Sequence, residues 1–271
     1  MSILQPFVAR LPIALLSCWF VLCADPRAAH AAPPWVDRAL TLPGGDWAFD
    51  VGLGVGHVPA PRDDTGVGVN MEMAVGLTSR VELGLRTGLR LGDGFERAIG
   101  GDSYGRLFDR QTIEEGAEVL ANPEVRVRGA LVRGSVFELA LEGRLVVPFA
   151  PGTDAGVLFG VPMAFHLGDS VRLDLGFYLP IVFFPHDPSL AIHVPVDLWI
   201  QATRRLWIGP MTGVAFERVG DNNGSQNVSL GFGLGYAITH YLDFKAMFLF
   251  PTINNDSRVF GGGAGIEVRI E

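Results

Sequence analysis

Residues 66–91, with the sequence GVGVNMEMAVGLTSRVELGLRTGLRL, contain two alternating runs separated by a short polar turn. In the first run, apolar side chains occupy every second position from Val67 to Leu77, and the second run resumes the pattern from Val81 to Leu91. Successive side chains point to opposite faces of a β-strand, so each run predicts a strand with one apolar face. Residues 78–80 join the two strands as a β-hairpin.

The second face of this hairpin mixes glycine and alanine with isolated charges such as Glu72 and Arg86. Glycine weakens a solvent-facing strand unless something needs the space. A transmembrane barrel places bulky apolar residues toward lipid and small or charged residues toward an aqueous lumen, in strands of roughly 9 to 11 residues. The hairpin is therefore typical of a transmembrane β-barrel.

The same alternation recurs along the chain, with short connections alternating with mostly longer, more polar ones. It predicts an all-β fold over residues 46–271, a single antiparallel up-and-down transmembrane β-barrel of about 12 strands with short periplasmic turns and longer extracellular loops. Besides the hairpin, the expected strands are residues 47–55, 117–131, 137–147, 157–167, 171–183, 191–201, 206–216, 228–236, 242–250 and 260–270.

The N-terminus predicts export from the cytoplasm. Residues 1–31 combine Arg10, an apolar run from Leu11 to Ala24 and a small-residue cleavage site at residues 29–31, the features of a secretory signal peptide. A competing interpretation takes residues 15–18, Leu-Leu-Ser-Cys, as a lipoprotein cleavage box. Residues 32–45 then form a periplasmic lead-in. Both cysteines, Cys18 and Cys23, precede the predicted barrel, which excludes a disulfide framework or a thiol nucleophile there.

Composition limits the partners. The formal net charge of −8 makes nucleic acid an unsuitable partner. No apolar run of about 18 residues follows the leader, which excludes a helical membrane protein but not a barrel. The expected partners are outer-membrane lipid and small hydrophilic solutes or ions, and a monomer is expected.

The predicted inner faces bring opposite charges together. Symmetric pairing about the turns places Glu72 opposite Arg86, and, about residues 132–136, Arg126 opposite Glu142 and Glu124 opposite Arg144. Such cross-strand pairs stabilise by roughly 0.2 to 1 kcal/mol each. The same construction places His166 beside Arg172, with Asp174 one step deeper. The predicted charged inner wall comprises Glu72, Arg86, Glu124, Arg126, Glu142, Arg144, Arg172, Asp174 and Asp197.

Two interpretations of this wall remain open. The charges form a structural salt-bridge network, or they line a narrow solute path, because twelve strands enclose more room than eight. Tyr178, Trp199 and Trp207 are also expected to face inward. Four more inward positions hold prolines, which suggest a band of β-bulges; they are Pro148, Pro162, Pro180 and Pro195.

We expect no enzyme. The histidines are spread over different loops and strands, and no serine shares a face and height with one on an adjacent strand, so no catalytic residue, metal site or cofactor is predicted. The irregular residues 92–116 have a length typical of functional or disordered loops. A soluble lipocalin-like barrel, with the apolar rows inside, is the alternative fold.

The leader, the Leu-Pro-Gly-Gly lead-in and the Gly-Leu-Thr-Ser-Arg-Val-Glu-Leu-Gly turn resemble those of small outer-membrane β-barrel proteins of Gram-negative bacteria, many of them porin-like. The resemblance extends from Trp47 to Glu271 and implies an outer-membrane location. It also implies a narrow channel for passive diffusion of small solutes or ions. The alternative is a closed, plugged barrel with a structural role, or one that binds a partner through its extracellular loops, chiefly residues 92–116.

Overall fold

The computed structural model describes residues 33–58, 64–91, 120–148, 155–183, 189–219 and 225–271. The predicted signal peptide and the long loop at residues 92–116 lie outside these ranges. Among the described residues, no helix is long and apolar enough to cross a membrane. One short 3-10 helix, η1 (Trp35–Asp37), precedes the first strand.

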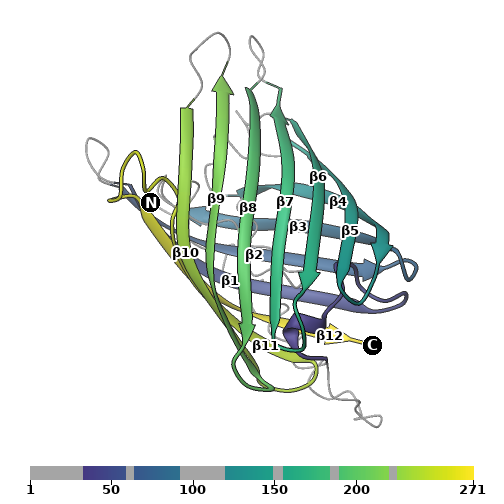
Figure 1. Cartoon of the computed structure of the whole chain (residues 1–271). Helices are drawn as coiled ribbons and strands as arrows, with labels where there is room; N and C mark the ends of the chain where they lie inside the picture. The colour runs from purple at the N-terminus through teal and green to yellow at the C-terminus, as the bar shows by residue number, and fades with distance from the viewer. Residues whose placement is uncertain (1–32, 59–63, 92–119, 149–154, 184–188, 220–224) are drawn as a thin grey trace, which may run out of the picture. The chain divides into compact units, whose positions relative to one another are not determined.

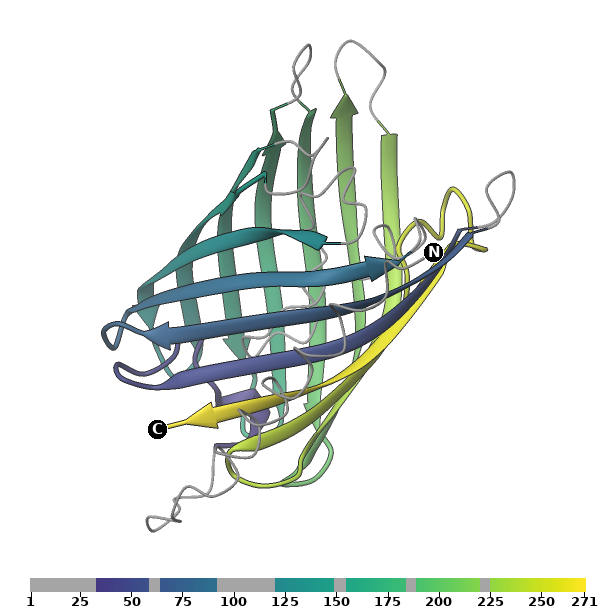
Figure 2. The same cartoon turned by 180° about the vertical axis from the view of Figure 1, so that it is seen from behind.

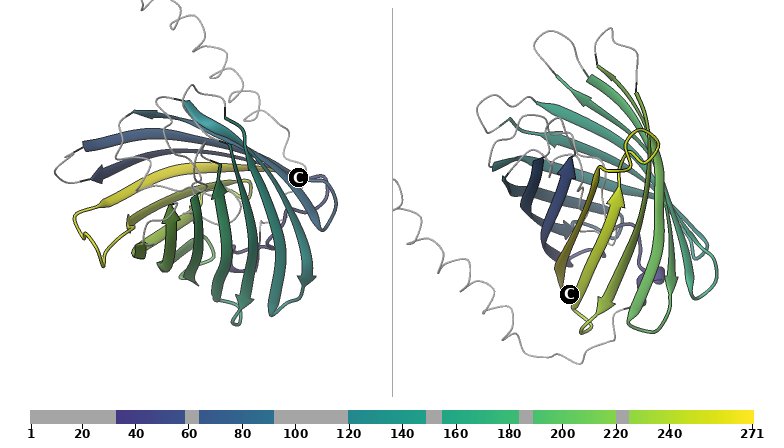
Figure 3. Two further views of the ribbon diagram at one scale, coloured as in Figure 1. Left: turned by 90° about the horizontal axis from the view of Figure 1, so that it is seen from above. Right: turned by 90° about the vertical axis from the view of Figure 1, so that its left-hand side faces the viewer.

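Twelve antiparallel strands form one closed barrel, shown from four directions in Figures 1 to 3. Each strand pairs with its neighbours in sequence, and β1 also pairs with β12, which closes the wall. The predicted up-and-down barrel is therefore confirmed. The strands are β1 (Trp47–Val58), β2 (Asp64–Gly76), β3 (Val81–Leu91), β4 (Leu120–Arg133), β5 (Phe137–Val146), β6 (Gly156–His166), β7 (Val171–Val182), β8 (Ser189–Gln201), β9 (Leu206–Val219), β10 (Ser225–Ala237), β11 (Leu242–Phe250) and β12 (Phe260–Ile270).

Five turns of three or four residues join the strands at one end of the barrel, which we call the short-turn end. Three of these turns share one device, a threonine whose hydroxyl accepts hydrogen bonds from backbone N–H groups two or three residues later. Thr78 accepts from the N–H of Val81 at 3.0 Å, and Thr203 accepts from that of Leu206 at 3.0 Å. Thr239 accepts from the N–H of Tyr241 at 3.2 Å. Threonine in these turns satisfies backbone donors that the strands leave unpaired.

The apolar rows face outward. Leu53 on β1 is 66% exposed and Phe159 on β6 is 58% exposed, whereas the alternate residues Ala140 and Leu158 are fully buried. Tyr178, with the two inward tryptophans, is also buried, as predicted. A soluble barrel would bury the apolar rows, so the lipocalin-like alternative is wrong.

The predicted band of proline bulges is wrong. The pairing of β6 with β7 runs through Pro162 and Pro180 without a register shift, and Pro195 lies opposite Gly213 in an unshifted pairing. Pro148 follows the end of β5 and lies outside the ladder. On its second side each in-strand proline lacks a ladder partner, because proline has no N–H to donate there.

Both register shifts found among the described residues lie along β4. One falls between Arg86 and Gly88 of β3, opposite Pro123, and the other between Ala130 and Val132. The irregular strand is thus a different one from those that the inward prolines suggested. Its shifts alter which charges meet on the inner wall.

Candidate solute path through the barrel

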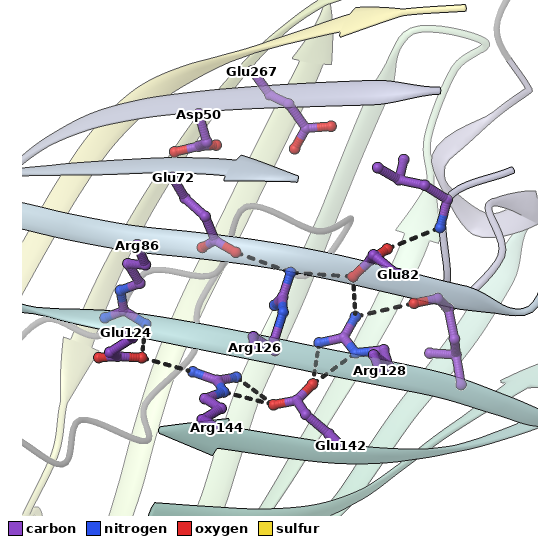
Figure 4. A network of polar contacts seen from close by, with 12 residues as sticks. Asp50, Glu72, Glu82, Arg86, Glu124, Arg126, Arg128, Glu142, Arg144 and Glu267 are labelled. Atoms are coloured by element: carbon purple, nitrogen blue, oxygen red, sulfur yellow. Dashed lines mark hydrogen bonds and ion pairs between the residues drawn. The ribbon is translucent and has the colours of Figure 1, made fainter. Parts of the chain in front are cut away.

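Eight charged side chains on β2 to β5 form a continuous ion-pair network on the inner wall (Figure 4). Arg126 Nη2 lies 2.9 Å from Glu72 Oε1 and 3.2 Å from Glu82 Oε1. Arg128 donates to Glu142 Oε2 at 2.6 Å from Nε. The network continues through Arg144, which lies 2.6 Å from Glu142 and 3.6 Å from Glu124, and it ends at Arg86, 3.9 Å from Glu124.

The structure brings the predicted wall residues of β2 to β5 together, but partly in another register. Glu72 lies opposite Arg86, as expected. On β4 and β5 the expected pairs are wrong, because Arg126 lies opposite Arg144 and Glu142 lies opposite Arg128. The turn is tighter than expected, with a hydrogen bond from the Gly134 N–H to the Phe137 carbonyl, and the bulge at residue 131 adds a further shift.

Residues that the prediction left out complete the network. Glu82 and Arg128 are both fully buried, yet neither was among the predicted wall residues. The alternation that placed Arg86 and Arg126 inward places these two inward as well. The sequence alternation therefore contained the information that both residues face inward, and the assumed strand register led to their omission from the predicted wall.

The remaining predicted wall residues lie on β7 and β8. Arg172 lies opposite His166, as expected, and its Nε donates to Asp174 at 2.8 Å. Asp174 in turn lies opposite Asp197 on β8. Arg172 is fully buried, whereas Asp197 is half-buried. These charges lie in a second group, on the far side of β6 from the network.

A third cluster lies on β1, β11 and β12. Lys245, the only lysine of the chain, contacts Asp50 and lies 2.8 Å from Glu267. Arg269 approaches Glu267 to 2.5 Å and Asp243 to 3.8 Å. Every second residue of β11 and β12 faces inward, so the strand pattern itself gathers these charges.

Residues 33–46 run along the inner wall at the short-turn end, where η1 lies in Figure 1. We call them the inner segment. Residues 33–45 of this stretch belong to the expected lead-in. Trp35 stacks on Trp207 of β9 with centroids 4.8 Å apart and meets Trp199 of β8 edge-on at 6.3 Å. Trp35 and Val36 are 1% exposed, so the ring is a buried anchor.

Inner-wall side chains hold the backbone of the inner segment. His166 of β6 donates to the Val36 carbonyl at 2.6 Å, and Glu138 of β5 accepts from the Leu40 N–H at 3.0 Å. Arg128 of β4 donates to the Leu40 carbonyl at 3.0 Å, and Glu82 of β3 accepts from the Leu42 N–H at 2.9 Å. The segment therefore follows the wall from β9 back to β2, where the Gly45 N–H donates to the Gly76 carbonyl at 2.7 Å.

One side chain of the inner segment reaches β11. Arg38 forms a two-pronged contact with Asp243, at 2.5 Å and 3.2 Å, and its guanidinium also lies over the rings of Trp35 and Trp207. Burial lowers the pKa of Arg38, and the nearby Arg269 charge adds to this effect, whereas Asp243 opposes it. Arg38 thus fixes the segment against a strand that the segment backbone does not follow.

A different part of the inner wall is open to solvent. Asp50, Gly52, Gly54 and Asn70, on β1 and β2, are half-buried, although they face inward. We call these four residues the polar strip. The inward residues His193, Pro195 and Asp197 of β8 are also half-buried. By contrast, the inward residues of β4 to β6 within the described ranges are nearly all buried.

A pocket of about 240 Å³ lies at the short-turn end beside the inner segment. The inner segment forms one side of this short-turn pocket, and side chains of β1, β3 and β12 form the other. The lining residues from those strands include Trp47, Glu82, Glu267 and Arg269. Glu82 and Glu267 belong to the buried inner wall, whereas Trp47 lies at the rim, so the pocket extends between the two.

A closed antiparallel barrel with an apolar outer face and a polar inner face has the architecture of a transmembrane β-barrel. Solved structures share this fold at low sequence identity. The NanC porin matches with a TM-score of 0.58 at 8% identity, over 82% of this chain and 100% of the porin. An outer membrane channel from Pseudomonas putida F1 matches with a TM-score of 0.58 at 9% identity, over 85% and 97% of the two chains.

The KdgM porin matches with a TM-score of 0.51 at 10% identity, over 83% of this chain and 99% of that one. No protein-family model and no curated protein sequence matches the chain. The chain is therefore a closed 12-stranded β-barrel with the fold of porin-like outer-membrane proteins.

Proposed function

We propose that this protein is an outer-membrane channel through which small hydrophilic solutes or ions diffuse passively. The observation that carries the proposal is the polar strip, because residues inside the barrel that remain accessible to solvent mark water-filled space. Twelve strands enclose more room than eight, whose interior side chains just fill the barrel. The outward apolar rows supply the lipid-facing surface that such a location requires.

The charged inner wall shapes this path. Glu72, Arg86, Glu124, Arg126, Glu142 and Arg144 fill the inner face of β2 to β5, next to the open space, with paired charge. Arg172, Asp174 and Asp197 add charge on β7 and β8. Charged walls set selectivity in such pores. Residues 1–31 serve as the export signal, and one chain forms one channel, since the barrel closes on itself without a partner.

The test is planar-bilayer conductance of the protein purified from outer membranes of expressing cells. Discrete, steady current steps are expected, and a salt gradient gives the ion selectivity from the reversal potential. Recovery of the protein from the inner membrane or the periplasm would contradict the proposed location. Silence from folded, inserted protein would contradict the channel.

The inner segment supports a second candidate, a closed barrel whose loops bind a partner. Its buried Trp35 and its contacts with several strands occupy much of the short-turn end. For this candidate the conductance is zero in the intact protein and also in variants whose inner segment is released. The two candidates therefore differ in one measurement.

A further inference from the structure

Two inner-wall side chains that hold the inner segment also contact each other. His166 of β6 reaches the Val36 carbonyl through Nδ1 at 2.6 Å. Glu138 of β5 accepts from the Leu40 N–H through Oε2 at 3.0 Å. The remaining atoms of the two side chains meet, with His166 Nε2 at 2.9 Å from Glu138 Oε1. The side chains are 9% and 6% exposed, so this chain of hydrogen bonds lies almost entirely away from solvent.

This arrangement requires a proton between the two side chains. A carbonyl oxygen only accepts hydrogen bonds, so Nδ1 of His166 carries a hydrogen. Without a further proton, Nε2 and a carboxylate oxygen of Glu138 would direct lone pairs at each other across 2.9 Å. The requirement is met by an imidazolium beside a carboxylate, or by a neutral imidazole beside a carboxylic acid. Both states hold the same number of protons, so the proton belongs to the pair.

Charged groups of the neighbouring elements surround the pair. Arg172 of β7 lies opposite His166, and its charge is balanced by Asp174 at 2.8 Å. Arg133 of β4 lies opposite Glu138, but its side chain is exposed. The other charged groups nearby are Arg128 of β4 and Asp37 and Arg38 of the inner segment. In ordinary surroundings arginine and carboxylates titrate outside the range from about pH 6 to 9, whereas histidine titrates inside it.

We propose that the pair of His166 and Glu138 makes the docking of the inner segment depend on pH, so that the segment is released as the pH rises. With the segment released, both side chains are hydrated, and a hydrated histidine loses its proton near about pH 6.5 while a hydrated glutamate is already ionised. Above this pH the docked state therefore holds one proton more than the released state, and raising the pH favours release. The device needs only the barrel and the segment, so it is independent of the proposed channel function.

The first test follows the accessibility of position 40 as the pH changes. Leu40 is 2% exposed, so a cysteine there is alkylated only when the segment leaves the wall. In lipid vesicles, peptide mass spectrometry gives the rate at which iodoacetamide labels Leu40→Cys. This rate is divided by that of Ala202→Cys, an exposed turn position that corrects for thiol ionisation. We expect the corrected rate to rise at least about tenfold from about pH 6 to about pH 9, as the loss of a buried, charge-assisted hydrogen bond implies.

The second test reverses the sign of the effect. In Glu138→Gln, the introduced amide N–H donates to Nε2 of a neutral His166, and the amide oxygen accepts from the Leu40 N–H. Every hydrogen bond is then made without the shared proton, whereas protonation of His166 at low pH sets two donors against each other. In the Leu40→Cys background, the corrected rate of this variant should therefore fall at least about threefold over the same rise in pH.

A matched control and a second variant complete the design. Asp169→Asn makes the same change from carboxylate to amide in the exposed turn after β6, and it should keep the pH dependence of the intact pair. His166→Gln removes the titrating ring, so its corrected rate should not change with pH. A corrected rate that is constant with the intact pair, or that rises equally in Glu138→Gln or His166→Gln, overturns the inference. None of these measurements depends on conductance, so the channel proposal is tested separately.

Discussion

The two sides of the barrel interior differ in the size and charge of their inward side chains. On β3 to β7, large charged side chains such as Arg128 and Arg172 are buried at 1% exposure or less, and the inner segment packs over them. On β12 and β1, glycines face each other across the strand pair, with Gly52 opposite Gly265 and Gly54 opposite Gly263. The first side fills its space with paired charge. The second side has paired charge only at the Asp50–Lys245–Glu267 cluster and elsewhere leaves space by omitting side chains.

This difference shows how a barrel of fixed strand number sets the width of its lumen. Each strand on both sides pairs with its two neighbours, so the order of the strands does not distinguish the two sides. The size of the inward side chains does. Open space thus follows from glycine at alternate positions of β1 and β12, and most of the buried charge lies on β3 to β7.

Removing one buried charge from the inner wall of β3 to β7 is expected to have the largest effect on stability. Arg128→Met removes the guanidinium that lies 2.5 Å from Glu142 and supports the Leu40 carbonyl. Because buried carboxylates then lose their compensation, we expect the free energy of unfolding to fall by about 3–5 kcal/mol. Urea unfolding in lipid vesicles, followed by tryptophan fluorescence, measures this loss.

The control for this variant is Arg258→Met, since Arg258 pairs with Asp256 on an exposed turn. It is expected to unfold at the same urea concentration as the intact protein. A loss for Arg128→Met below about 1 kcal/mol, the range of surface ion pairs, would show that the buried network is not a stabilising core.

The second largest effect is expected from releasing the inner segment, which packs over the charged inner wall of β3 to β7. Trp35→Ala removes a fully buried ring, a change that costs about 3–5 kcal/mol in protein cores. The loss weakens the docking of the segment rather than the barrel. In a Leu40→Cys background, where position 40 is 2% exposed, maleimide labelling should accelerate at least about a hundredfold.

Phe159→Ala serves as the comparison, because this ring faces outward and is 58% exposed. When Phe159→Ala is combined with Leu40→Cys, the maleimide labelling rate at position 40 should equal that of Leu40→Cys alone. Equal rates for Trp35→Ala and Phe159→Ala would mean that Trp35 does not hold the segment in place.

The smallest effect is expected from filling the open side. A Cβ at Gly52 would meet its nearest neighbour, the Ala264 carbonyl oxygen, at 3.7 Å, so a side chain fits there without moving the backbone. At Gly265 a Cβ would lie 2.7 Å from the Val51 carbonyl oxygen, which makes that position unsuitable. Gly52→Trp should therefore lower single-channel conductance at least about twofold by narrowing the lumen.

Gly143→Trp is the matched control, since a Cβ there meets nothing within 4 Å and the residue belongs to the outward row of β5. Its conductance should match that of the intact protein. If Gly52→Trp conducted equally well, the path would not follow the glycine side.

The alternation in the sequence predicted the strands closely. The bounds expected for β3, β11 and β12 are those found, because each strand has an apolar outer row that only one alignment can turn toward lipid. The same rule placed Tyr178, Trp199 and Trp207 inside. The local alternation is enough to predict the orientation of a residue wherever one face of the strand must be apolar because it faces lipid.

Pairing between strands was less predictable. The turn after β4 is shorter than the polar composition of residues 132–136 suggested, and the bulge at residue 131 has no sequence signature of its own. The opposite-charge argument failed there, because long arginine side chains reach partners one or two positions away. Arg144 pairs with Glu142 on its own strand, which no cross-strand rule foresees.

The position of the inner segment could not be predicted from the sequence. Residues 33–46 have no periodicity, and their partners lie from 30 to 205 residues further along the chain. Trp35 and Arg38 are anchors only because Trp207 and Asp243 are brought to the same place by the closed barrel. Such long-range contacts are a property of the fold rather than of any stretch of sequence.

The separation between Arg38 and Asp243 also has a consequence for assembly. The two residues are 205 positions apart, and Asp243 reaches its place only when β11 has joined the sheet. Contacts this distant form late, because the closure of so long a loop must be compensated by structure already present. We therefore expect the barrel wall to be complete before its N-terminal segment settles inside it.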